Sequence, residues 1–200
     1  MKKAIFMDRD GTISEEVGYV NHISRFKVID RTPEAISLIN RSDFLAIAVT
    51  NQAGVARGYF KEDMIWRVHE KLANILKEKN AHLDAIYYCP HHPKEGQEPY
   101  RKDCNCRKPK TGMIDAAKKD LDIDLTKSYM IGDKLSDVEF AHKVGSKGIL
   151  VLTGYGRGEY EAICEDEKVG GKAPKIKPDH VAEDLYDAVK WILENDKRPL

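Results

Sequence analysis

The sequence lacks an excess of charge of either sign. Its 200 residues carry 33 basic and 33 acidic side chains, so the net charge is zero when histidine is neutral. A balanced chain has no overall field that would draw it to nucleic acid or to an anionic membrane, and its lysines and arginines form no basic arm. We therefore expect a small-molecule substrate and no nucleic-acid or membrane partner.

Long hydrophobic runs are also missing. The longest has six residues, at 44–49, and the run at 149–152 has four, whereas a membrane span needs about 20. The apolar run after Lys2 and Lys3 ends at Asp8, which is too short for the core of a signal peptide. We expect a cytoplasmic monomer, in which cysteine thiols stay reduced.

Cysteine is scarce, with four in the chain, and three of them share a pattern with one histidine. Cys89 and His91 are followed, after twelve residues, by Cys104 and Cys106. Reduced thiols exclude a disulfide-stapled fold, and three thiolates with one imidazole make a closed tetrahedral zinc set. Because the set leaves no position for water, we expect the Zn²⁺ to be structural and to order a loop over residues 89–110.

Short apolar runs alternate with amphipathic stretches along the chain. The pattern predicts strands over residues 4–7, 44–49, 85–88, 128–131, 148–152 and 180–181. It predicts helices over residues 32–39, capped by Thr32, and over 61–76, 113–121, 137–144, 159–164 and 185–193. This alternation is typical of an α/β fold with a Rossmann-like doubly wound parallel sheet. We expect one domain over residues 1–200, with the zinc loop as an insertion and no large cap domain; residues 155–178 receive no role.

Polar side chains follow several of the predicted strands. Asp8 and Asp10 come after the first strand, Thr50 after the second and Asp133 after the fourth, and Lys108 precedes a helix. Because the carboxyl ends of parallel strands meet at one edge of a sheet, these groups can converge. Asp and Gly also favour ordinary turns, but acids, a hydroxyl and a lysine in this order match what phosphoryl transfer requires. Two neighbouring carboxylates there need a cation, and the reaction needs a nucleophile and a proton donor.

In this order and context the clusters resemble the four motifs of the haloacid dehalogenase superfamily. The resemblance implies that Asp8 is the nucleophile, which forms an aspartyl-phosphate, and that Asp10 moves the proton. It implies that Thr50 and Lys108 bind the phosphoryl oxygens. It also implies that Mg²⁺ is held by Asp8, the backbone carbonyl of Asp10 and Asp133.

The zinc loop is similar to that of two phosphatase families of this superfamily. These are the D-glycero-D-manno-heptose-1,7-bisphosphate phosphatases and the histidinol-phosphate phosphatases. Residues 50–58, 87–93 and 106–109 resemble the heptose family, and the resemblance favours His91 over His92 as the zinc ligand. It implies hydrolysis of the C7 phosphate, giving heptose 1-phosphate for lipopolysaccharide biosynthesis. A histidinol-phosphate phosphatase is the alternative, and a catalytically inactive zinc-organised binding module is the alternative of another class.

The resemblance and the charge of a bisphosphate together predict the substrate-binding residues. A second dianion calls for cations besides Lys108. Arg57, Arg107 and Lys134 are the candidates, although Arg57 and Lys134 can equally be solvated or paired with an acid. The residues expected to bind the substrate are Glu16, Val17, Gly18, Tyr19, Thr50, Asn51, Gln52, Ala53, Arg57, Arg107, Lys108 and Lys134.

Overall fold

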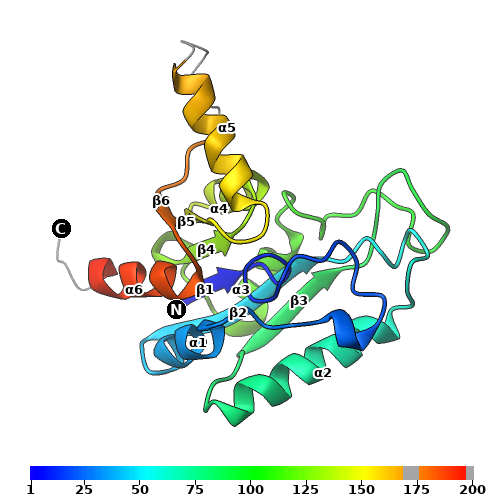
Figure 1. Ribbon diagram of the computed structural model, residues 1–200, viewed down its shortest axis with the longest axis horizontal. Coiled ribbons are helices and arrows are strands. Elements are labelled where there is room, and N and C mark those ends of the chain that lie inside the picture. Colours follow the sequence, from blue (N-terminus) through cyan, green and yellow to red (C-terminus); the bar gives the residue numbers. More distant parts are fainter. Residues whose placement is uncertain (169–175, 197–200) are drawn as a thin grey trace.

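The computed structural model of the protein describes residues 1–168 and 176–196. Within that part of the chain, six parallel strands form one sheet in the order β3-β2-β1-β4-β5-β6, with helices on both faces (Figure 1). The strands are β1 (Lys3–Met7), β2 (Phe44–Asn51), β3 (Ala85–Cys89), β4 (Tyr129–Gly132), β5 (Lys147–Val151) and β6 (His180–Ala182). The helices are α1 (Thr32–Asn40), α2 (Asp63–Glu78), α3 (Gly112–Leu121), α4 (Leu135–Lys143), α5 (Gly156–Lys168) and α6 (Leu185–Asp196). The predicted doubly wound parallel sheet without a large cap domain is confirmed.

The central strand β1 is apolar at successive positions because both of its faces are covered. Ile5 and Met7 are buried in the core that the sheet shares with α1, α2 and α6. Ala4 and Phe6 point the other way, into the core against α3 and α4. A strand buried on both faces loses the usual alternation of apolar and polar residues, which explains the continuous apolar run that precedes Asp8.

The strand order reverses at β1. From there the chain adds β2 and β3 on one side and, later, β4 to β6 on the other. Open α/β sheets bind ligands in the crevice outside the carboxyl ends of the strands at this point. Asp8 follows β1 directly, and its backbone N–H donates to the carbonyl of Ile131 in β4 at 2.9 Å. The two central strands therefore fix the position of the first acid.

Several element boundaries differ from the predicted ones. Thr32 is the first helical residue of α1 and not its cap, because its side chain is buried in the core. Arg31 takes the capping position at a φ of 65°. Helix α5 begins at Gly156 and extends beyond the predicted short helix, and it projects away from the sheet (Figure 1). Of the stretch without a predicted role, residues 169–175 lie outside the described part. None of the described helices is long and apolar enough to cross a membrane.

Candidate active site and zinc centre

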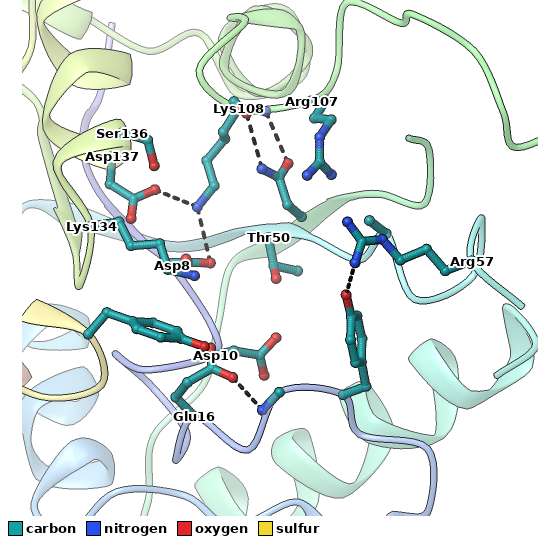
Figure 2. Close-up of a pocket in the computed structure, with 15 residues that line it drawn as sticks. Asp8, Asp10, Glu16, Thr50, Arg57, Arg107, Lys108, Lys134, Ser136 and Asp137 are labelled. Carbon is teal, nitrogen blue, oxygen red and sulfur yellow. Dashed lines mark hydrogen bonds and ion pairs between the residues drawn. The ribbon is translucent and has the colours of Figure 1, made fainter. Parts of the chain in front are cut away.

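Lys108 and Asp8 meet at the base of a pocket of about 360 Å³ at the carboxyl ends of the central strands. The Lys108 Nζ atom lies 3.1 Å from the Asp8 carboxylate and 2.7 Å from that of Asp137 (Figure 2). It also donates to the carbonyl of Val49 at 3.0 Å. Burial alone would lower the pKa of Lys108, but Asp137 and Asp8 raise it above its usual value. The lysine is therefore a fixed cation.

Three buried carboxylates cluster here, and two of them, Asp8 and Asp137, contact that cation. Oxygens of Asp8, Asp133 and Asp137 lie within 4.8 Å of one another. Burial and the neighbouring Asp8 raise the pKa of Asp133 to about 7, and burial raises the pKa of Asp8 to about 6. The Oδ1 atom of Asp133 is buried and has no hydrogen-bond partner in the described structure. One lysine does not neutralise three acids, so this donor set fits a divalent cation with oxygen ligands.

The turn after β1 reaches this acid cluster because Gly11 has no side chain. Gly11 has a φ of 87°, and a Cβ atom there would clash with the carboxylate of Asp133. Only glycine combines that backbone conformation with so close an approach. The glycine of the Asp-x-Asp-Gly sequence therefore brings the turn against Asp133.

Asp10 is oriented by several donors. The guanidinium of the buried Arg9 donates to both carboxylate oxygens, through Nη2 to Oδ2 at 2.7 Å and through Nε to Oδ1 at 3.0 Å. Gln52 Nε2 donates to Oδ2 at 2.7 Å, and the Ser14 hydroxyl lies 3.3 Å from Oδ1. Gln52 also donates to the Thr50 hydroxyl at 2.8 Å. This network fixes the carboxylate and ties it to the end of β2.

Asn51 holds the backbone of Lys108 in place. Its side-chain oxygen accepts from the Lys108 N–H at 3.0 Å, and its amide nitrogen donates to the Lys108 carbonyl at 3.2 Å. The paired bonds dock the segment after the zinc loop onto the end of β2. Asn51 thus positions the lysine as well as lining the pocket.

The cysteine and histidine side chains of the zinc loop converge. The Sγ atoms of Cys89, Cys104 and Cys106 and a ring nitrogen of His91 all lie within 4.8 Å of one another. His91 Nδ1 is 3.3 Å from the Cys106 sulfur. His92 instead points its Nε2 atom toward the Arg57 guanidinium at 3.4 Å, so the structure brings only one of the two candidate histidines to the sulfurs. Three thiols and one imidazole fit a closed zinc site.

Two arginines line the far side of the pocket. Figure 2 shows Arg57 and Arg107 on the side away from Lys134. Arg57 Nη1 donates to the Tyr19 hydroxyl at 2.7 Å, and its Nε atom lies 3.1 Å from a Glu95 carboxylate oxygen. Arg107 Nη1 donates to the carbonyl of the zinc-loop residue His91 at 3.2 Å. The loops after β1 and β2 and the zinc loop thus supply this end of the pocket.

Most of the predicted substrate-binding residues line the pocket, but two do not. Val17 packs against the core and Gln52 faces Asp10, and neither lines the pocket. The residues that line it are Glu16, Gly18, Tyr19, Thr50, Asn51, Ala53, Arg57, Arg107, Lys108 and Lys134. Ser136, Asp137 and Tyr155 also line it without having been predicted as site residues. Asp137 follows the predicted metal ligand Asp133 by four residues, whereas Tyr155 lies in the stretch left without a role.

The fold and this set of residues define the chain as a phosphatase of the HAD-like hydrolases, which act on phosphoric monoesters. The HAD-hydrolase-like family model matches residues 105–188. The predicted resemblance to this superfamily is confirmed.

Relatives of known name match much more of the chain. The D-glycero-beta-D-manno-heptose-1,7-bisphosphate 7-phosphatase of Haemophilus influenzae is 46% identical over 169 residues, 82% of this chain and 90% of that protein. The protein of the same name from Pasteurella multocida is 42% identical over 96% of this chain and 97% of its own. The chain therefore belongs to the D-glycero-D-manno-heptose-1,7-bisphosphate 7-phosphatase family.

A solved structure agrees with this assignment. The crystal structure of D,D-heptose 1,7-bisphosphate phosphatase from B. bronchiseptica, complexed with magnesium and phosphate, has a TM-score of 0.80 and 30% sequence identity. The match covers 96% of this chain and 99% of that one.

Proposed function

We propose that this protein hydrolyses the C7 phosphate of D-glycero-D-manno-heptose 1,7-bisphosphate, giving heptose 1-phosphate for lipopolysaccharide precursors. The observation that carries the proposal is the distribution of charge in the pocket. Asp8, Lys108 and Lys134 lie at one end, and Arg57 and Arg107 lie at the other (Figure 2). A substrate with a dianion at each end matches this arrangement. The names of the relatives support the same substrate.

The first half-reaction transfers the phosphoryl group to the protein. The carboxylate of Asp8 attacks phosphorus while the bond to the C7 oxygen breaks, and Asp10 gives its proton to the departing alkoxide. The Thr50 hydroxyl and the Lys108 ammonium hold the phosphoryl oxygens. The product of this step is an aspartyl-phosphate on Asp8.

The second half-reaction releases phosphate. Asp10 now takes a proton from water, the water oxygen attacks phosphorus, and the bond to the Asp8 oxygen breaks. Asp8, the carbonyl of Asp10 and Asp133 would hold Mg²⁺, which neutralises negative charge on the phosphoryl oxygens when it is bound. The buried, unpartnered oxygen of Asp133 supports this ligand set.

The zinc ligands have a structural role in this proposal. Zn²⁺ on the four converging donors would order residues 89–110, and that loop carries Arg107 and Lys108 immediately after its last ligand, Cys106. Its binding energy in small zinc peptides, about 10–16 kcal/mol, is enough to order a loop that has no core of its own. We also propose that residues 1–200 act as one phosphatase domain in the cytoplasm, where thiol ligands stay reduced.

Phosphate release from four substrates tests the reaction. The purified protein, loaded with Mg²⁺ and Zn²⁺, is given both anomers of heptose 1,7-bisphosphate, heptose 7-phosphate and histidinol phosphate. We expect one bisphosphate anomer to have the highest kcat/KM, with the remaining phosphate on C1 by ³¹P NMR. Faster turnover of histidinol phosphate would favour the alternative family and overturn the proposal.

A substitution separates the two ends of the pocket. Arg57→Ala removes a cation from the far end, so we expect kcat/KM for the bisphosphate to fall about 10-fold or more while that for heptose 7-phosphate stays within about 2-fold. Arg67→Ala, on the exposed face of α2, is the matched control. An equal loss on both substrates would show that Arg57 does not recognise the second phosphate.

A further inference from the structure

Tyr155 is a large aromatic residue that the reaction steps above do not use. It lies in the turn between β5 and α5, its side chain is 50% exposed, and it lines the catalytic pocket next to Lys134. It also lines a second hollow together with Glu16 and Gly18, which border the catalytic pocket as well. The ring of Tyr155 therefore stands on the boundary between the two spaces.

The backbone that carries this ring is fixed by the active site itself. The N–H of Tyr155 donates to Asp133 Oδ2 at 2.9 Å, and the Thr153 hydroxyl donates to the carbonyl of Gly11 at 2.6 Å. Gly154 lies between them, and a Cβ atom there would clash with the Asp133 carboxylate. A side chain held on so constrained a turn loses little backbone freedom when it contacts a ligand.

The ring lies at the reacting end of the pocket. The Lys134 ammonium is 4.4 Å from the Tyr155 ring centroid, a cation–π distance. Although burial lowers it, the pKa of Lys134 is raised by the charges of Asp133 and Asp8, which places the lysine among the groups that surround the phosphoryl site. The other pocket tyrosine, Tyr19, accepts a hydrogen bond from Arg57, which lies on the opposite side of the pocket (Figure 2). At each end, one of the cations thus lies over an aromatic ring.

Apolar surface is scarce near Asp8 and Lys108, where charged side chains line the pocket. The Lys134 ammonium lies over one face of the Tyr155 ring, so the opposite face is the apolar surface that the ring offers to a ligand. A sugar chain presents C–H groups that can pack against such a face, and aromatic rings contribute large apolar contact area.

Resting on the proposed function, we propose that Tyr155 is a specificity-determining residue. Its ring packs against the C–H groups of the sugar carbons next to the scissile phosphate ester. The ring therefore distinguishes phosphorylated substrates by the carbon chain attached to the ester oxygen. A phosphate on a group without such a carbon chain makes no contact with the ring, so Tyr155 does not strengthen its binding.

Two substrates and two variants test this assignment. Wild type, Tyr155→Ala and Tyr155→Phe are assayed with heptose 1,7-bisphosphate and with acetyl phosphate, which has no sugar carbons. For Tyr155→Ala we expect kcat/KM to fall about 10-fold on the sugar, mainly through KM, and to stay within about 2-fold on acetyl phosphate. Tyr155→Phe keeps the ring and is expected to match wild type on both. Trp66→Ala, an exposed aromatic on α2, controls for loss of surface aromatic area.

The outcomes separate the possible failures. Turnover of acetyl phosphate by Tyr155→Ala shows that the variant is folded and its centre intact. An equal loss on both substrates would mean that the ring acts through Lys134, and no loss on either would mean that it contacts no sugar; both results overturn the assignment. If wild type hydrolyses acetyl phosphate but not the heptose bisphosphate, the proposed function itself fails, and this inference falls with it.

Discussion

The Lys108 ammonium is closer to Asp137, at 2.7 Å, than to Asp8, at 3.1 Å. Its Nζ atom also donates a hydrogen bond to the Val49 carbonyl at 3.0 Å, so three oxygen atoms already contact an ammonium group that has three N–H donors. A phosphoryl oxygen that binds to Lys108 must therefore replace one of these acceptors. Asp8 is the acceptor that changes partner as it attacks, so Asp137 is the group that keeps the lysine in place.

Removing the charge of Asp137 should therefore slow turnover without unfolding the protein. We expect Asp137→Asn to lower kcat about 100-fold, because the lysine loses its strongest partner and its alignment. The variant removes one of three crowded carboxylates, so we expect the thermal midpoint without added Mg²⁺ to be unchanged or higher.

Glu139→Gln is the matched control for Asp137→Asn. It neutralises an acid on the same helix whose partner is Lys143 at the surface, and we expect wild-type kcat. A wild-type kcat in Asp137→Asn would contradict the positioning role of that residue.

Gln52 offers a test of how Asp10 is oriented. The sequence suggested substrate binding, but the side chain is buried and donates to Asp10 and Thr50. We expect Gln52→Ala to lower kcat about 10-fold with little change in KM, because a misaligned carboxylate transfers protons poorly. Steady-state kinetics on the heptose bisphosphate check this, with Gln97→Ala in the zinc loop as the control. A raised KM at unchanged kcat would restore the role in binding.

Loss of zinc should disorder the zinc loop, residues 89–110, without unfolding the sheet. We expect Cys106→Ser to lose stoichiometric zinc and to lower kcat/KM about 10-fold or more, because Lys108 follows two residues after this ligand. Of the zinc ligands, only Cys89 is fully buried in the core against α3 and α4, while Cys104 and Cys106 are half-buried and pack against that core, so near-native far-UV circular dichroism is expected. Cys164→Ser, on α5 outside the cluster, should keep both zinc and activity. Full activity of a zinc-free Cys106→Ser protein would refute the coupling.

The parts that the sequence predicted best are those with local physical causes. Asp8, Asp10 and Asp133 follow apolar strands, and a parallel sheet brings such strand ends together whatever the details of packing. The spacing of the zinc ligands, Cys89 and Cys106 among them, is likewise typical of side chains that bind one metal ion in tetrahedral geometry.

The parts it missed depend on tertiary contacts. Thr32 looks like a helix cap in the sequence, but it is buried and its hydroxyl has no hydrogen-bond partner in the described structure. The roles of Gln52 and Asp137 follow from hydrogen bonds to residues that are distant in the chain. Tyr155 gave no periodic signal, since one residue between two glycines has no pattern, and only the packing of its turn against Asp133 brings it to the pocket.

His69 predicts how the stability of the protein depends on pH. This histidine on α2 is 7% exposed, and its Nε2 atom has no hydrogen-bond partner in the described structure. Burial, with a further contribution from the charge of Arg9, lowers its pKa from 6.5 to about 4. Between these two values the unfolded chain binds a proton that the folded chain does not. The contribution of His69 to the free energy of unfolding is therefore complete above pH 6.5, and it is lost as the pH falls from 6.5 toward 4.

From pH 7.5 to pH 5.0 this single group should remove about 2 kcal/mol from the free energy of unfolding. Urea unfolding of wild type and His69→Gln at both pH values isolates the effect, because glutamine does not titrate and the other groups are shared. We expect the variant to lose about 2 kcal/mol less than wild type over this interval. His82→Gln, at a largely exposed position, should keep the wild-type difference. Equal pH dependence in wild type and His69→Gln would mean that the buried imidazole can be protonated in the folded protein.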